Sequence, residues 1–165
     1  MATMSQPHVS DDSSARCDAF ARDERIVLLG LLMEAHGRLT RQLNADLEAS
    51  SSLPLTWYDV MVRLRRSPEQ RLTMGELANQ IVLTTGGVTR LIDRLEEAGL
   101  VERVSCPTDR RTTYLTLTEL GDARLEEATV AHLDHLDHRL VSRLSPAERQ
   151  VLRETLERLC EGSCG

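Results

Sequence analysis

The spacing of apolar residues changes from a helical period to a period of two at Gly99, and this change constrains the fold most. Before Gly99, a capping box at Thr73-Met74-Gly75-Glu76 and a cap at Thr84 predict two helices joined by a tight turn, a helix-turn-helix. After Gly99, residues 100–104 and 112–117 alternate around a polar, arginine-bearing loop, which predicts a β-hairpin, or wing. The apolar side chains expected to face inward from the two helices are Leu77, Ala78, Ile81, Val88, Leu91, Ile92 and Leu95.

Two helices are predicted before this central unit. A repeat of apolar residues every three or four positions predicts the first, from about Asp18 to Leu47, and residues 50–54 interrupt it. A capping box at Thr56 and Asp59 predicts the start of the second. The apolar stripe of the first helix, which needs a surface to lie against, consists of Leu28, Leu32, Ala35, Leu39 and Leu43. The side chains expected to face inward from the second helix are Trp57, Val60, Met61 and Leu64.

Two helices are also predicted after the hairpin. Thr118 caps one that continues to about Leu144, and Ser145-Pro146-Ala147-Glu148 begins another that ends at about Cys160. The predicted fold class is therefore mostly α, of the α+β type, with a winged helix-turn-helix between long helices.

The chain is expected to hold one folded domain, residues 18–160. Residues 1–17 are polar and lack an apolar period, which predicts a mobile N-terminal tail, and residues 161–165 form a C-terminal tail. The most apolar run, Ile26–Met33, is too short to span a bilayer, and the N-terminus does not resemble an export signal. The four cysteines form no metal-spaced pair, so we expect a reducing cytoplasm.

The charge of the chain must be considered locally. The net charge is −6, which does not favour a polyanion partner, yet residues 57–121 carry nine basic and nine acidic side chains and are neutral. All 20 basic residues are arginine, whose planar guanidinium suits phosphate and guanine. Arginines gathered on one face, with the acids elsewhere, would reconcile this balance with DNA binding.

The predicted order of elements suits DNA. A helix fits the major groove, its N-terminal residues meet base edges, and an arginine on a neighbouring loop reaches a minor groove or phosphates. Thr85, Gly86, Gly87, Thr89 and Arg90 lie on or near the exposed N-terminal face of the second helix, where the glycines leave room for the duplex.

The sequence resembles the MarR family over roughly residues 20–160. The matching motifs are Leu72–Ala78, Val88–Val101, Asp109–Arg111 and Leu117–Gly121. The resemblance implies a homodimeric, sequence-specific transcriptional regulator, most often a repressor, that binds a pseudo-palindrome and responds to a small molecule. It assigns residues 53–121 to the winged helix-turn-helix, and residues 18–52 and 122–160 to dimerisation helices.

The same resemblance implies that Arg110 or Arg111 enters the minor groove and that Asp109 orients the loop. The residues expected at double-stranded DNA are therefore Thr84, Thr85, Gly86, Gly87, Thr89, Arg90, Arg94, Asp109, Arg110 and Arg111. An effector cleft between the DNA-binding lobe and the dimer helices would bring His36, Trp57, Tyr58 and Arg63 within reach of a ligand.

Alternatives of the same fold remain open at this point. Cys17, Cys160 and Cys164 near the chain ends could meet across subunits as a redox sensor, and Cys106 near the wing tip could be oxidised. Neighbouring pairs among His132, His135 and His138 could share a metal, although the helical rotation disfavours all three on one ion, so no metal site is assigned.

Two other classes of protein compete with a DNA-binding regulator. A winged helix used only for protein–protein interaction would need no DNA, and the arginine-bearing wing disfavours it. The sequence has no glycine-rich phosphate loop, no GxSxG elbow and no HExxH motif, so we expect neither an enzyme nor a bound cofactor.

Overall fold

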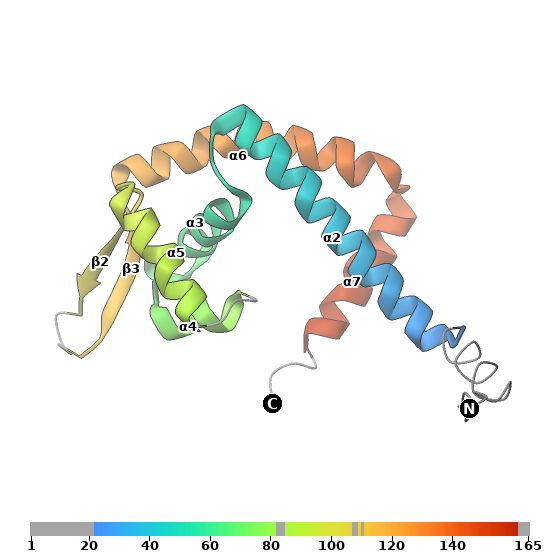
Figure 1. Ribbon diagram of the computed structural model, residues 1–165, viewed down its shortest axis with the longest axis horizontal. Helices are drawn as coiled ribbons and strands as arrows, with labels where there is room; N and C mark the ends of the chain where they lie inside the picture. Colours follow the sequence, from blue (N-terminus) through green and yellow to red (C-terminus); the bar gives the residue numbers. More distant parts are fainter. Residues whose placement is uncertain (1–21, 82–84, 107–108, 110, 162–165) are drawn as a thin grey trace, which may run out of the picture. The chain divides into compact units, whose positions relative to one another are not determined.

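A computed structural model describes residues 22–81, 85–106, 109 and 111–161, without the side chain of Thr85 (Figure 1). The chain divides into two compact units, residues 1–39 and 40–165. The elements are α2 (Glu24–Ser51), α3 (Leu55–Arg66), η1 (Pro68–Gln70), β1 (Arg71–Thr73), α4 (Met74–Gln80), α5 (Thr85–Glu97), β2 (Val101–Ser105), β3 (Thr113–Leu117), α6 (Glu119–Arg139), η2 (Val141–Arg143) and α7 (Pro146–Glu161). The predicted mostly helical α+β fold is confirmed.

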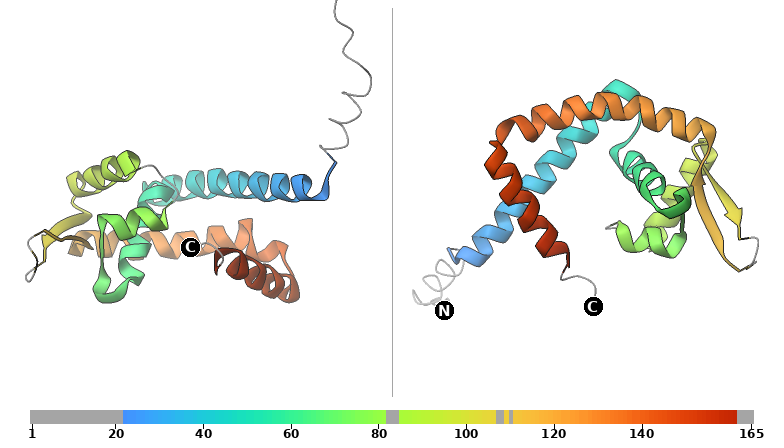
Figure 2. Two further views of the ribbon diagram at one scale, coloured as in Figure 1. Left: turned by 90° about the horizontal axis from the view of Figure 1, so that it is seen from below. Right: turned by 180° about the vertical axis from the view of Figure 1, so that it is seen from behind.

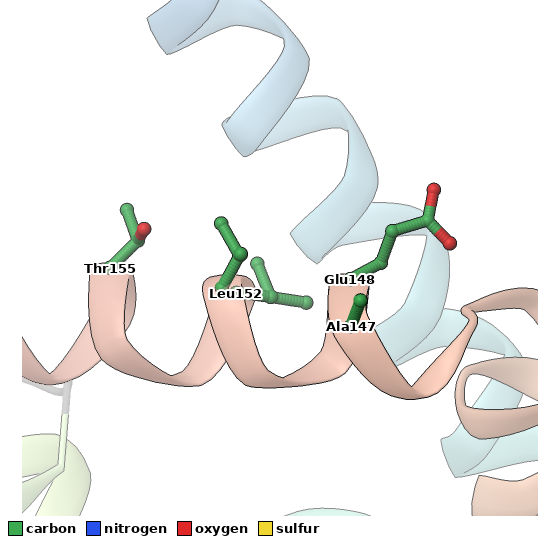
Figure 3. A pocket seen from close by; sticks show the side chains of 5 residues that line it. Ala147, Glu148, Leu152 and Thr155 are labelled. Carbon is green, nitrogen blue, oxygen red and sulfur yellow. The ribbon is translucent and has the colours of Figure 1, made fainter.

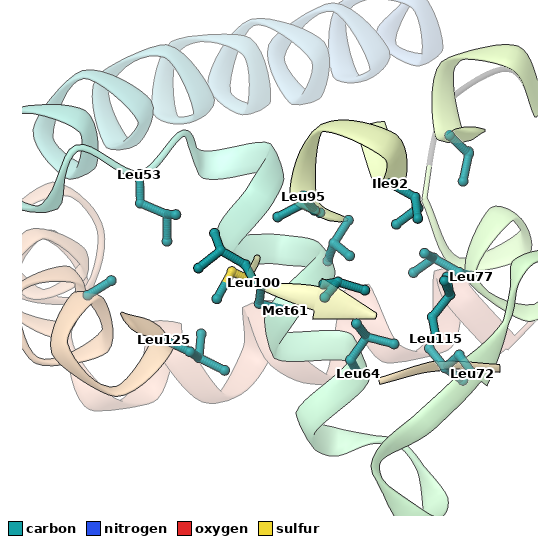
Figure 4. Close-up of a cluster of buried hydrophobic side chains, with 14 of the residues drawn as sticks. Leu53, Met61, Leu64, Leu72, Leu77, Ile92, Leu95, Leu100, Leu115 and Leu125 are labelled. Carbon is teal, nitrogen blue, oxygen red and sulfur yellow. The ribbon is translucent and has the colours of Figure 1, made fainter. Parts of the chain in front are cut away.

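The core lies among α3, α4, α5, α6 and the sheet (Figure 4). Met61 and Leu64 of α3, Leu77 of α4, and Ile92 and Leu95 of α5 are fully buried, as the apolar pattern predicts. Truncating one buried leucine of such a core to alanine costs about 2–5 kcal/mol. The remaining buried apolar side chains are Leu47, Leu53, Val60, Leu72, Val88, Leu100, Val101, Leu115, Leu125 and Ala128.

Where the described residues include the predicted cap, the helix starts follow it with one exception; the cap predicted at Thr84 lies outside the described residues. Thr73 and Glu76 form the predicted capping box of α4, and Ser145 exchanges the same pair of bonds with Glu148 at the start of α7. The box predicted at Thr56 and Asp59 is wrong, because α3 already begins at Leu55 after Pro54. The Asn44 side chain accepts the Leu55 N–H, at 2.9 Å. A residue of α2 therefore accepts a free backbone N–H at the start of α3, the role expected of the Thr56 side chain.

The ends of two helices differ from expectation. The helix α2 runs on to Ser51 and stops where Ser52 takes a positive φ of 56°. The helix α6, expected to reach about Leu144, ends at Arg139 and is followed by the short turn η2. No glycine or proline marks this second end, so the sequence carried no signal for it.

The sheet has three antiparallel strands in the order β1-β3-β2. The predicted hairpin pairs Val101 with Leu117 and Ser105 with Thr113, and in both views of Figure 2 it extends beyond the neighbouring helices. The unpredicted strand β1 pairs Leu72 with Leu115. Because β1 leads directly into α4, the wing is hydrogen-bonded to the segment that begins the helix-turn-helix.

Among the described residues, no helix combines the length and the apolar character needed to cross a membrane.

The first turn of α6 approaches the end of α5 very closely. Gly99, with φ of 69°, ends α5 as predicted, and Thr118 Oγ1 donates to its carbonyl oxygen at 2.6 Å. The same Thr118 hydroxyl accepts the Gly121 N–H at 2.9 Å, and the Thr118 N–H donates to the Leu100 carbonyl at 3.2 Å. This junction therefore joins the start of α6 to the residues between α5 and β2.

We predict that Gly121→Ala destabilises the protein. A Cβ at Gly121 would stand 1.9 Å from the Leu100 carbonyl oxygen, so backbone must move. Overpacking of this kind costs about 1–3 kcal/mol or more, measurable as a lower urea midpoint of unfolding. Gly75→Ala is the control, since a Cβ there meets nothing within 4 Å. Equal midpoints for the two variants would disprove the close approach.

His132 of α6 is buried against α3. Its side chain is 5% exposed, and its ring centroid lies 4.7 Å from that of Tyr58. Its Nδ1 is buried and has no hydrogen-bond partner among the described residues. Burial, and secondarily the charge of His135, lower the pKa of His132. The unfolded chain therefore takes up this proton at a higher pH than the folded chain does.

We predict that the free energy of unfolding falls as the pH drops below about 6.5, the ordinary histidine value. The reason is that the unfolded state then binds more protons than the folded state. In His132→Phe this dependence should weaken, whereas His138→Gln, which removes an exposed histidine of the same helix, should keep it. Urea unfolding at several pH values between neutral and mildly acidic measures these slopes, and an unchanged slope in His132→Phe would contradict the prediction.

Candidate nucleic-acid interface

One face of α5 is exposed and polar, and the opposite face is in the core. Val88, Ile92 and Leu95 are buried, whereas Gly86, Thr89, Arg90 and Arg94 are exposed and Gly87 is half-buried. A Cβ at Gly86 would meet nothing within 4 Å, so the backbone there borders open space. The first turn of α5 can therefore be approached closely from outside.

Three of the residues expected at DNA lie partly or wholly outside the described part of the chain. Thr84 and Arg110 are not described, and Thr85 is described only as the first residue of α5. Their expected roles remain predictions.

The loop of the wing is organised by Asp109. Its carboxylate accepts the Arg111 N–H at 2.9 Å and the Thr112 hydroxyl at 3.0 Å, and the Thr112 N–H donates to the Asp109 carbonyl at 3.0 Å. The loop closes where the Cys106 N–H donates to the Thr112 carbonyl, at 2.9 Å. These bonds give Asp109 the loop-orienting position that the resemblance implied, and they leave the Arg111 side chain exposed.

The arginines of this lobe fall into two groups. The first group is paired with carboxylates in the pairs Arg63–Asp59, Arg65–Asp122, Arg71–Glu69, Arg103–Asp93 and Arg103–Glu96. The second group, with no ion pair among the described residues, consists of Arg66, Arg90, Arg94 and Arg111. The acids of this lobe that form ion pairs therefore pair with other arginines, and Arg90, Arg94 and Arg111 have no carboxylate partner among the described residues.

Arg103 ties the wing to α5, a role that was not predicted from the sequence. From β2 its guanidinium donates to Asp93 of α5, at 2.7 Å, and to Glu96 one turn later. The hydrogen bond to Asp93 and the nearby charge of Glu96 raise the pKa of Arg103 above its ordinary value. Asp93 and Glu96 lie three residues apart, on one face of the helix, and Arg103 follows in the next strand. This spacing is the sequence signal that could have predicted the contact.

The four residues expected near an effector have different neighbours. His36 is exposed on α2, and Trp57 is half-buried against the core. The Tyr58 hydroxyl lies 3.2 Å from Thr129 Oγ1, whereas Arg63 pairs with Asp59 at 2.9 Å. A hollow of about 360 Å³ includes Arg63 but neither Trp57 nor Tyr58. The common cleft for all four stays a prediction.

The histidines and cysteines are described only in part. His132 is buried, His135 half-buried and His138 exposed, and no three His, Cys, Asp or Glu side chains of the described residues gather as metal ligands would. Cys106 is half-buried and Cys160 is exposed. Cys17 and Cys164 lie outside the described residues.

Comparison with known proteins agrees with this geometry. The sequence profile of the MarR family matches residues 51–112. The HTH-type transcriptional regulator MhqR of Bacillus subtilis (strain 168) is 28% identical over 137 residues, 83% of this chain and 92% of that protein. The transcriptional repressor MprA of Escherichia coli (strain K12) is 30% identical over 140 residues, 82% of this chain and 78% of that protein.

Solved structures are similar over a comparable length. Sco3205, a MarR family transcriptional regulator from Streptomyces coelicolor in complex with DNA, gives a TM-score of 0.76 at 29% identity, covering 84% of this chain and 87% of that one. A mutant MarR from E. coli complexed with operator DNA gives 0.72 at 26% identity, covering 83% and 96%. The relatives named by activity are regulators, which agrees with the expectation that the chain is not an enzyme. The helix-turn-helix, the wing and these matches together show that this chain belongs to the MarR family of transcriptional regulators.

Proposed function

We propose that this protein is a homodimeric, sequence-specific DNA-binding repressor. In this proposal α5 enters the major groove of a pseudo-palindromic operator, and Arg111 of the wing, with Arg110, reaches the minor groove or its phosphates. The observation that carries the proposal is the division of the arginines, in which Arg90, Arg94 and Arg111 have no ion pair within the part of the chain that the structure describes.

The charge distribution supports DNA as the partner. Phosphate contacts supply much of the affinity of such proteins, and each needs a cation that is not already neutralised. Arg90 and Arg94 are one turn apart on the exposed face of α5. The Asp109 carboxylate accepts the backbone N–H of Arg111 in the wing loop. The acids of the lobe therefore do not cancel the cations that would meet DNA.

The relatives support the finer parts of the proposal. Two similar structures were solved with DNA, one of them with operator DNA, and MprA is named a repressor. We carry these properties over to this chain and expect it to act in the cytoplasm, where bacterial regulators meet the chromosome. Release by a small molecule is part of the proposal.

Exposed apolar side chains on the terminal helices support a homodimer. On α7, Val151 and Leu152 contribute to an apolar hollow of about 360 Å³ on one helix face (Figure 3). A second copy of the chain would cover such surface and supply the second recognition helix that a palindrome requires. The exposed apolar side chains are Ile26, Val27, Leu28, Leu29, Leu31, Leu32 and Met33 on α2, and Val151, Leu152, Leu156 and Leu159 on α7.

We predict that Arg90→Ala and Arg111→Ala each weaken binding to the operator without unfolding the protein. Loss of one base or phosphate contact costs about 1–3 kcal/mol, or roughly 5- to 150-fold in Kd. Fluorescence anisotropy with the chain's own upstream DNA and a random fragment, at two salt concentrations, measures this effect. The same titration should give two chains per operator.

Arg143→Ala is the control, because Arg143 is exposed in η2 without an ion pair among the described residues. Its operator affinity should equal that of the wild type. Unchanged binding in both Arg90→Ala and Arg111→Ala would exclude α5 and the wing as the DNA-binding face. Equally weak binding of upstream and random DNA by the wild type would favour the protein-interaction alternative.

We also predict that Asp109→Ala lowers operator affinity although it removes a negative charge. Removal of a charge alone would strengthen binding to DNA, whereas loss of the bonds to Arg111 and Thr112 releases the wing loop. The expected weakening is about 1 kcal/mol, or roughly fivefold, which is the usual net value of a hydrogen bond. Tighter binding by Asp109→Ala in the same anisotropy assay would show that the loop bonds are dispensable.

A further inference from the structure

Arg103 lies on the inner face of the sheet, the face that packs on the core. Its register partner across the hairpin is Leu115 of β3, whose partner on the other side is Leu72 of β1. Side chains directly opposite one another in a sheet point to the same face, and both leucines are buried. The Arg103 side chain therefore leaves β2 on the core side, where α5 packs against this strand.

Beyond Arg103, the inner face of the wing is exposed. The next residues on that face are Ser105 and its partner Thr113, and both are exposed. The strand β1 pairs with β3 no further than Tyr114, so this end of the hairpin has two strands rather than three. The bonds of Asp109 join residues of the wing loop to one another. The outer part of the wing thus extends from the point at which Arg103 meets α5.

The guanidinium of Arg103 makes a two-point contact with α5. Nη2 donates to Asp93 Oδ1 at 2.7 Å, and Nη1 donates to the carboxylate of Glu96. Two bonds from one planar group to successive turns of a helix fix both its distance and its rotation. The side chains of Arg103, Asp93 and Glu96 are 30%, 49% and 40% exposed, so their pairing adds little to folding stability. The contact therefore acts mainly through geometry.

The two parts that Arg103 joins carry the cations of the proposed DNA complex, Arg90 on α5 and Arg111 on the wing. These two side chains would reach different grooves, so both can bind only if the wing tip stands at a fixed distance from the helix. We propose that Arg103 is a positioning residue for DNA binding, whose two bonds to α5 hold the wing where Arg111 and the helix engage one half-site together. This role rests on the proposed function, whereas the placement of the wing is a property of the free protein.

The placement of the wing is tested first without DNA. Residual dipolar couplings of backbone amides in the full isotope-labelled chain compare the orientation of the wing with that of α5. In the wild type, the couplings of Ser105 and Thr113 should fit the alignment tensor of α5. In Asp93→Ala/Glu96→Ala, the untethered variant, they should no longer fit it, while those of β1 and α5 still do. A fit as good in the untethered variant as in the wild type overturns the proposal.

The consequence for DNA is tested by adding Arg111→Ala to each background and measuring operator Kd by anisotropy. In the wild type this change should weaken binding roughly 5- to 150-fold. In the untethered variant it should weaken binding less than about twofold, because a displaced wing no longer makes the contact. Glu97→Ala/Glu102→Ala is the matched control, since it removes two exposed acids that have no ion pair among the described residues. In this control Arg111→Ala should keep its full effect.

Arg90→Ala distinguishes loss of wing position from general damage to the lobe. It should weaken operator binding by the same factor in the wild type and in the untethered variant, because Arg90 is on the helix itself. An undiminished Arg111→Ala effect in the untethered variant, or equal loss of both effects there, overturns the proposal. An Arg111→Ala effect absent from the wild type as well refutes the proposed wing contact, and with it the DNA-binding role of Arg103, whereas unchanged dipolar couplings refute the tether itself.

Discussion

The contact between Gly121 and the Leu100 carbonyl is the constraint on which the lobe depends. Only glycine lets the first turn of α6 come this close to the backbone that follows α5. The Thr118 hydroxyl completes the junction, because it donates to the Gly99 carbonyl and accepts the Gly121 N–H. The recognition helix, the start of the wing and the long helix α6 thus share a single anchor.

Ion pairs inside the lobe separate the arginines that have a carboxylate partner from those that have none among the described residues. An exposed pair stabilises a protein by only about 0–1 kcal/mol, so Arg65–Asp122 and its counterparts matter little for folding. Their effect is selective neutralisation. Residues 57–121 hold equal numbers of acids and bases. Arg90, Arg94 and Arg111 nevertheless have no ion pair among the described residues, because the acids that do form ion pairs here, Asp59, Glu69, Asp93 and Glu96, form them with other arginines. Net charge alone therefore says little about the partner of this chain.

Local signals predicted most of the fold, and contacts between distant residues account for what they missed. Three signals depend only on residues within one turn of a helix end, and all three are confirmed: the caps at Thr73 and Thr118 and the glycine at position 99. The strand β1 is too short to show alternation and exists only through its partner β3. The start of α3 depends on Asn44 of the preceding helix. The role of Arg103 depends on Asp93, which lies in α5, ten residues earlier in the chain. For the candidate site, the exposed face of α5 followed from periodicity, whereas the division of the arginines needed their neighbours in space.

The strand order β1-β3-β2 has a mechanical consequence. The central strand β3 is bonded on one side to β2 and on the other to β1, which continues without interruption into α4. Arg103 ties β2 in turn to α5. The wing and the helix-turn-helix are therefore joined by strand pairing on one side and by a charged hydrogen bond on the other, so a shift of one disturbs the contacts of the other. If two copies of the chain bind an operator as proposed, a change in the spacing between its half-sites would have to be accommodated outside these contacts, for example by bending of α6.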